Sequence, residues 1–136
     1  MLFFVERFWQ ELLKFSRRTE GQLARWAARY GIKENPKATF DNAKKNGVGR
    51  YTCVNLTNCH TIEFRIFRGT LKYNTLIATL QLVSRICDIS TWMTDKEITL
   101  LNWCDFVSGV EEPELITYLK ERRLYVNEPV ECEEEY

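Results

Sequence analysis

The stretch that decides the fold is "TIEFRIFRGT", residues 61–70, which has the composition of a β-strand yet carries three charges. Side chains alternate across a strand, and the apolar alternation predicts a core-facing set: Ile62, Phe64 and Ile66. The opposite face then presents Glu63 and Arg65 together with Phe67, and the two charged residues lie about 7 Å apart at their backbones. An acid and a base placed in this way fit either a ligand site or the solvent-exposed face of a half-buried antiparallel sheet.

The residues around this stretch predict a hairpin and a long helix. A strand-like segment, "RYTCVNL" at residues 50–56, precedes "HTIEFRIF" at 60–67, and the three residues between them are short enough for an antiparallel hairpin. Residues 74–89 are apolar on most sides and follow a predicted N-cap at Asn74, so we expect this helix to be buried across the inner face of the hairpin. The fold class is therefore α+β, with a hairpin packed against several helices.

Helical spacing of apolar residues predicts further helices on both sides of the hairpin: residues 2–13, a short one closed by Gly31, one opened by a Thr94–Glu97 capping box and running through Phe106, and one from Pro113 to Leu124. The segment 33–49 has the Pro, Asn and Gly content of a loop.

The first helix starts without a capping side chain, and a sheet of two strands leaves two open edges. We therefore expect a chain cut from a longer protein, whose missing part covers the first helix and adds strands.

The composition fits one folded domain in a reducing, cytoplasmic setting. The 136 residues are 45% apolar with a formal net charge of zero, but residues 1–50 hold eleven Lys or Arg against five Asp or Glu, whereas residues 128–136 hold five Glu and no base. We expect this acidic tail to be solvated and disordered.

The five cysteines form no C-x-x-C pair and have one histidine to join them, which argues against a zinc site. Cys87 and Cys104 are interpreted as small buried hydrophobes. Charges within the first seven residues argue against a signal peptide or a membrane segment.

Residues 50–83, "RYTCVNLTNCHTIEFRIFRGTLKYNTLIATLQLV", resemble the C-terminal part of the amidoligase family, whose members are relatives of glutamine synthetase and glutamate-cysteine ligase. The shared pattern is Arg-Tyr opening a strand, Asn-Leu ending it, then Thr-Ile-Glu-Phe-Arg, and Gly-Thr before a long apolar helix. A looser likeness extends to residues 14–31 and 118–127. The resemblance implies that residues 1–127 are the C-terminal part of a catalytic domain, in which the hairpin belongs to a larger glutamine-synthetase-like antiparallel sheet.

The activity that this resemblance implies is an ATP-dependent carboxylate-amine ligase. A carboxylate substrate takes the γ-phosphoryl group of ATP to become an acyl phosphate, and an amine substrate then displaces the phosphate to leave an amide. By the same resemblance, Glu63 would be a ligand of Mg²⁺, Arg65 would contact the transferring phosphoryl group, and Arg50 would contact nucleotide phosphates or the substrate carboxylate. Arg68 is a further candidate contact to the ATP phosphates. Mg²⁺ prefers a few hard oxygen ligands, and phosphoryl transfer needs charge neutralisation, so an acid and a base on one strand face suit both needs.

The chain also departs from the family. The family's earlier half supplies further strands and metal carboxylates, and nothing in residues 1–49 resembles them. A single carboxylate does not hold several magnesium ions. We therefore expect the isolated chain to be inactive, and to need either the missing N-terminal half or self-association.

The alternative interpretation is a non-catalytic binding module. Its basic first fifty residues carry aromatic side chains that could contact nucleic acid or a protein: Trp9, Trp26, Tyr30 and Phe40. The zero net charge and the position of these aromatics within apolar stripes favour the ligase and argue against a nucleic-acid partner.

Four polar residues near the predicted site have weaker assignments. Arg17 and Arg18 are interpreted as residues that cap a helix dipole rather than contact a substrate. His60 is interpreted as a turn residue. Asn55 fits a ligand contact and the start of a turn equally well.

Overall fold

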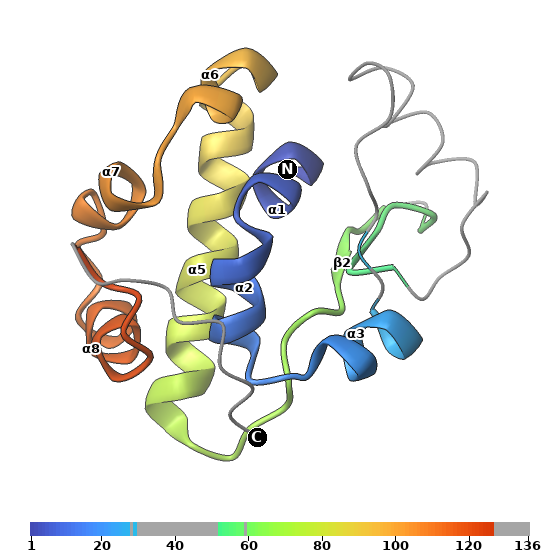
Figure 1. The fold of residues 1–136 in the computed structure, drawn as a ribbon, viewed down its shortest axis with the longest axis horizontal. Helices are drawn as coiled ribbons and strands as arrows, with labels where there is room; N and C mark the ends of the chain where they lie inside the picture. Colours follow the sequence, from blue (N-terminus) through green and yellow to red (C-terminus); the bar gives the residue numbers. More distant parts are fainter. Residues whose placement is uncertain (28, 30–51, 59, 127–136) are drawn as a thin grey trace.

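The computed structural model describes residues 1–27, 29, 52–58 and 60–126. These residues form a mostly helical α+β structure with a small antiparallel sheet of two strands (Figure 1). The α+β class is therefore confirmed, and the described residues show no larger sheet. Four sequence predictions lie outside the described residues: the strand start at Arg50, the helix end at Gly31, the loop at 33–49 and the acidic tail at 128–136.

The first predicted helix is divided in two by a kink at Phe8. Helix α1 (Leu2–Arg7) and helix α2 (Trp9–Ser16) meet at this residue, whose φ of −111° and ψ of 35° are not helical. The helical hydrogen bonds continue on both sides, since Phe8 N–H donates to Phe4 O at 3.0 Å and Phe8 O accepts from Leu12 N–H at 2.9 Å. Helix α1 has no side-chain cap, as the sequence predicts.

Helix α3 (Glu20–Trp26) follows after a sharp corner. Arg17 has a positive φ of 61° and ends α2, which turns the chain away from the helix axis. A capping box then starts α3, because the Thr19 side chain accepts from Gln22 N–H while the Gln22 side chain accepts from Thr19 N–H. Together these two features leave residues 17–19 between the helices, with Arg17 ending α2 and Thr19 capping α3.

The hairpin is much shorter than the sequence predicts. Strand β1 (Val54–Asn55) and strand β2 (Glu63–Phe64) pair in antiparallel register, with Val54 opposite Phe64 and Asn55 opposite Glu63. Arg65 N–H adds one more bond, to Cys53 O at 2.9 Å. Pairing stops beyond Asn55 because its side-chain oxygen accepts from both the backbone N–H and the hydroxyl of Thr57, which starts a turn.

The predicted alternation of the strand is only partly confirmed. Ile66 is fully buried, but Ile62 is 49% exposed and Phe64 is half-buried, so the prediction of a core position for Ile62 was wrong. Ile62 precedes the paired residues, and the period of two that governs a ladder does not reach it. Phe67 packs edge-on against Phe15, with ring centroids 5.7 Å apart.

The long helix, α5 (Tyr73–Trp92), packs mainly against helix α8 (Pro113–Glu121) rather than across the hairpin. The predicted cap at Asn74 was wrong: Lys72 is the N-cap, and Asn74 instead donates its side-chain amide to Glu114 O at 3.2 Å. Gln81 contributes twice, donating to the Glu114 carboxylate at 2.9 Å and accepting from Leu115 N–H at 3.0 Å. The bond from Leu115 N–H satisfies one of the backbone donors that a helix leaves unpaired at its start.

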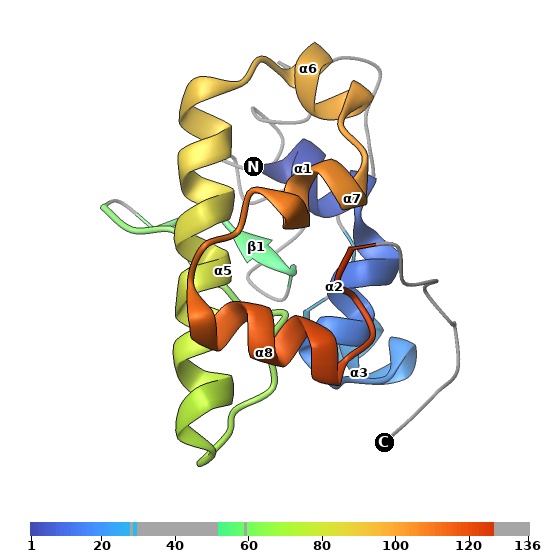
Figure 2. The same ribbon diagram turned by 90° about the vertical axis from the view of Figure 1, so that its left-hand side faces the viewer.

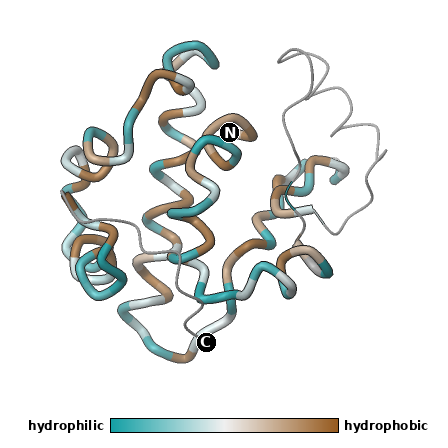
Figure 3. Tube along the Cα trace, in the orientation of Figure 1, coloured by the Kyte–Doolittle hydropathy of each residue, from teal (hydrophilic) through white to brown (hydrophobic). Residues whose placement is uncertain are grey.

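One face of α5 is open, which the sequence did not predict. Its buried positions are Thr75, Ala78, Leu82 and Ile86. Its exposed positions include large apolar side chains: Tyr73, Leu76, Leu80 and Trp92. Hydrophobic and hydrophilic stretches alternate along the helix in Figure 3, as expected when one face is covered.

The predicted helix from Thr94 through Phe106 is two helices, α6 (Asp95–Leu100) and α7 (Trp103–Ser108). Thr94 caps α6 as predicted, accepting from Glu97 N–H. The chain then extends, because the Asn102 side chain accepts from Asp105 N–H at 2.8 Å and caps a new helix. The predicted start of α8 at Pro113 is confirmed. Figure 2 shows α6, α7 and α8 on one side of the molecule, beside α5.

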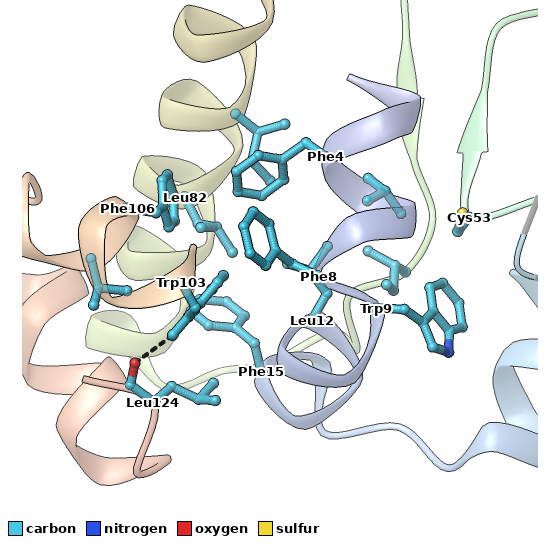
Figure 4. Packing of buried hydrophobic residues seen from close by; sticks show 14 of the residues in the cluster. Phe4, Phe8, Trp9, Leu12, Phe15, Cys53, Leu82, Trp103, Phe106 and Leu124 are labelled. Carbon is cyan, nitrogen blue, oxygen red and sulfur yellow. Dashed lines mark hydrogen bonds between the residues drawn. The ribbon is translucent and has the colours of Figure 1, made fainter. Parts of the chain in front are cut away.

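The main core lies between the N-terminal helices and this C-terminal layer (Figure 4). The Phe4 ring packs edge-on against Phe106 at 4.9 Å between ring centroids, and Phe8 against Trp103 at 5.4 Å. The Trp103 indole N–H donates to Leu124 O at 2.7 Å, which ties the end of the described chain to this cluster. The first helix's stripe of Phe4, Phe8 and Leu12 was expected to await a missing half, but the chain's own residues bury it.

Three cysteines lie among the described residues, and two of them, Cys87 and Cys104, are free thiols. Cys53 is buried, whereas Cys87 and Cys104 are half-buried rather than buried as the sequence predicts. Within the described part of the chain, no helix combines the length and the apolar character that crossing a membrane requires.

Candidate anion-binding site

The corner between α2 and α3 is joined to the chain that leaves β2. Arg68 N–H donates to Ser16 O at 3.2 Å. The Arg17 guanidinium donates through Nη2 to Arg68 O at 2.9 Å, and the Arg18 guanidinium donates through Nη2 to Phe67 O at 3.4 Å. Residues about fifty positions apart in sequence therefore form one polar junction, on the side of α2 that faces away from α7 and α8 (Figure 1).

A shallow cleft opens at this junction. Its volume is about 290 Å³, and it is lined by two arginines, one carboxylate and two aromatic rings: Arg18, Glu63, Phe64, Arg65 and Phe67. The predicted neighbours on the strand face therefore share a cleft, and Phe64, predicted to face the core, lines it as well. The register explains this, because Phe64 is half-buried at the end of a ladder only two residues long.

Glu63 and Arg65 form an ion pair in the cleft. Glu63 Oε1 accepts from Arg65 Nη1 at 3.1 Å, with side chains 44% and 22% exposed respectively. Their predicted proximity is confirmed, whereas their roles as metal ligand and phosphoryl contact stay predictions. An exposed pair of this kind contributes little to stability, so its position in a cleft is more informative than its strength.

Positive charge exceeds negative charge at the junction. The pKa of the Arg18 guanidinium is lowered by burial first, and then by the positive charges of Arg65 and Arg68. The Nε atoms of Arg17 and Arg18 are buried and find no hydrogen-bond partner among the described residues. Like charges and donors without acceptors are both relieved by a bound anion.

The other predicted site residues are placed less favourably. Arg68 is exposed, and it is not among the described residues that line the cleft, although its charge reaches Arg18. Arg50 lies outside the described residues. Asn55 begins a turn, as one of its two alternatives predicts, and His60 is exposed just before β2, as expected of a turn residue.

The sequence favoured helix capping over substrate contact for Arg17 and Arg18, and Arg17 is the C-cap residue of α2. Both guanidiniums also bond carbonyls of the strand exit, which the sequence did not predict. A local signal could have identified the corner: the Thr19–Gln22 capping box fixes the start of α3 and leaves the two arginines outside both helices. Their partners 49 and 51 residues away are not visible in any local pattern.

The cleft has one candidate ligand for a divalent metal. Among the described residues, no three His, Cys, Asp or Glu side chains gather closely enough to hold a metal ion by themselves. Mg²⁺ bound with ATP commonly uses one or two carboxylates plus phosphate oxygens and water. Glu63 fits such a partial coordination for one Mg²⁺ carried by phosphates.

The alternative interpretation, a basic surface with aromatic side chains, is weakened by the position of Trp9. This side chain is 6% exposed, and it points away from the main aromatic cluster (Figure 4). The Arg29 guanidinium covers its ring at 5.6 Å and pairs with the Glu6 carboxylate at 2.6 Å. Trp9 is therefore not available to stack on a base. The described residues do not include Tyr30, Phe40 or the Trp26 side chain.

Compared with known proteins, the chain matches no family model, no curated protein and no solved structure.

Proposed function

We propose that this chain is the C-terminal part of an ATP-dependent carboxylate-amine ligase, with the cleft as the phosphate side of its active site. The observation that supports this most is the meeting of Glu63, Arg65 and Arg18 in one cleft. Two of these residues belong to the Thr-Ile-Glu-Phe-Arg stretch that resembles the amidoligase family, and the third comes from the looser region of the same resemblance. The chemistry needs an acid beside guanidiniums, and the cleft provides both.

Each residue has a distinct role in the proposal. Glu63 would hold Mg²⁺ that arrives with ATP, and the bound metal would supply charge neutralisation between phosphate oxygens. Arg65 would then exchange its bond to Glu63 for a bond to the transferring phosphoryl group. A planar guanidinium suits this exchange because it presents parallel N–H donors to two oxygens.

The proposal also requires groups beyond the cleft. Further carboxylates, the larger antiparallel sheet and the pocket for the nucleotide base would come from a missing N-terminal half or from another copy of the chain. Arg50 keeps its proposed place near the nucleotide phosphates or the substrate carboxylate, and Arg68 near the ATP phosphates. The carboxylate and amine substrates would be an amino acid or a peptide.

The test is Mg²⁺-dependent binding of ATP by the purified chain. We expect ATP with Mg²⁺ to raise the thermal unfolding midpoint, and Glu63→Gln to remove the part of this shift that depends on Mg²⁺. Glu121→Gln is the matched control, because Glu121 pairs with Lys72 at 3.5 Å away from the cleft. The same shift in Glu63→Gln and wild type, or no shift with ATP, would overturn the proposal.

Catalysis is measured as the rate of ADP release when the chain is given ATP, Mg²⁺ and mixtures of amino acids. We expect none from the chain alone, because the cleft has one carboxylate among its described lining residues. Turnover that needs both a carboxylate and an amine would contradict the requirement for another chain segment.

A further inference from the structure

We propose that the corner between α2 and α3 forms, with β2, a binding site for a multiply charged oxyanion of the phosphate class, and that Arg18 is its principal binding residue. The natural ligand's identity rests on the proposed function, whereas the anion site itself does not. It would exist equally in a protein that binds a phosphorylated metabolite without ligating anything.

Arg18 is held in place before any ligand arrives. The corner backbone is anchored by the Ser16 carbonyl, which accepts from Arg68 N–H. The Ser16 hydroxyl also accepts from Arg18 N–H at 3.1 Å, while it donates to Leu13 O at 2.7 Å. The Arg18 guanidinium is then fixed at its far end by Phe67 O. A side chain restrained at both ends loses little conformational freedom on binding a ligand.

The Arg18 guanidinium also has donors to spare. A guanidinium carries five N–H donors, and among the described residues Arg18 makes one long bond, of 3.4 Å, through Nη2. An oxyanion at the cleft would accept hydrogen bonds from the remaining donors of the guanidinium that face the cleft.

The charge around Arg18 favours an anion. Arg18 lies close enough to Arg65 and Arg68 for their charges to disfavour its own. Glu63 is the one carboxylate among the described cleft-lining residues, and it already pairs with Arg65. A ligand with two or more negative charges would offset the repulsion, whereas a neutral or cationic ligand would not.

The size of the cleft fits a compact anion. Pockets for drug-sized ligands occupy about 300–1,000 Å³. The cleft, at about 290 Å³, lies at the lower end of this range, which is enough for a phosphate chain. The Phe64 and Phe67 rings line part of it and reduce its contact with water.

One substitution, Glu63→Gln, distinguishes the proposed anion site from the proposed ligase function. An anion competes with Glu63 for Arg65, so removing the carboxylate should strengthen anion binding when no metal is present. Under the proposed function the same change weakens binding of ATP with Mg²⁺. Glu63→Gln therefore has opposite effects in the two experiments.

The test is calorimetric titration of the chain with tripolyphosphate in metal-free buffer. We expect Arg18→Gln to weaken binding at least tenfold and Glu63→Gln to strengthen it several-fold. Arg18→Lys should recover part of the affinity, because it restores the charge without the planar fork. Arg7→Gln is the matched control, since the Arg7 guanidinium also donates to a carbonyl, Leu101 O at 3.2 Å, away from the cleft. Arg7→Gln should bind like wild type.

Equal affinity in wild type and Arg18→Gln, or equal losses in Arg7→Gln and Arg18→Gln, would overturn the site. Thermal unfolding of each variant checks folding. If Arg18→Gln does not fold, Arg65→Gln takes its place with the same expected tenfold loss. Binding of tripolyphosphate that depends on Arg18, without any Mg²⁺-dependent binding of ATP, would support the proposed anion site and contradict the proposed ligase function. Mg²⁺-dependent binding of ATP that is unchanged by Arg18→Gln would contradict the proposed anion site and support the proposed ligase function.

Discussion

The two ends of helix α2 bury opposite kinds of chemistry. Near its start, Phe8 packs among the rings of Phe4, Trp103 and Phe106. At its end, two residues beyond the buried Phe15, the chain places the Nε atoms of neighbouring arginines out of reach of water. The first region lowers the free energy of the folded chain by packing alone. The second leaves polar groups unsatisfied, which is a feature of sites that await a ligand.

This contrast separates the part of the chain that stabilises the fold from the part that we assign to function. The aromatic region joins α1 and Phe8 to α7 through packed rings. The arginine region is held by backbone bonds between the helix corner and the strand exit. Substitutions in the first region should therefore change stability, and those in the second should change ligand affinity.

The largest expected effect comes from the aromatic region. Phe4→Ala should lower the free energy of unfolding by about 3–5 kcal/mol, because a fully buried ring leaves a cavity. Urea denaturation measures the change, and Leu100→Ala is the control at a side chain that is 75% exposed. A loss below about 1 kcal/mol would show that this region does not dominate stability.

A smaller effect tests the register of the hairpin. Ile66→Ala should lower the free energy of unfolding by about 2–4 kcal/mol because Ile66 is fully buried. Ile62→Ala, at a residue that is 49% exposed, should change it by less than about 0.5 kcal/mol. Urea denaturation measures both changes. A larger loss for Ile62→Ala than for Ile66→Ala would mean that the charged residues lie on the core side, which would contradict the assignment of the cleft.

The smallest expected effect concerns an ion pair within the helical layer. Burial opposes ionisation of Glu112, but hydrogen bonds and charge from Arg85 outweigh it and lower the pKa of this carboxyl below its ordinary 4.5. A lowered pKa in the folded state contributes stability above the unfolded pKa and loses it as the pH falls through the folded value. Glu112→Gln should cost at most about 1 kcal/mol at pH 7, since both partners are partly exposed.

The pH dependence of that difference is the measurement. Urea denaturation of wild type and Glu112→Gln at pH 7 and near pH 3 should show a gap that narrows in acid. A gap that stays constant or widens as the pH falls would contradict the role given to Arg85.

Local signals predicted the boundaries of several elements, because their causes are local. Pro113 begins a helix and Thr94 caps one, as their side chains dictate. The breaks at Phe8 and Asn102 were missed for different reasons. Asn102 has a capping side chain that the apolar spacing obscured, whereas the kink at Phe8 has no local sequence cause and accompanies packing against distant rings.

The candidate site also has a part that the sequence predicted and a part that it did not. Strand alternation predicted that Glu63 and Arg65 share a face, since the period of two is a property of the strand itself. It did not predict Arg18, because only tertiary structure brings residue 18 to residue 67. The exposed face of α5 was also missed, because apolar content alone does not show which side of a helix is covered. The likeness to amidoligases stays a prediction.

The positive φ of Arg17 places a backbone penalty at the residue whose side chain holds the corner together. A left-handed conformation costs a residue with a side chain about 1–2 kcal/mol, and glycine avoids most of this penalty. The Arg17 guanidinium donates to Arg68 O and so holds the strand exit against the corner. Glycine at position 17 would therefore relax the backbone of the corner and, at the same time, release the strand exit whose Phe67 lines the cleft.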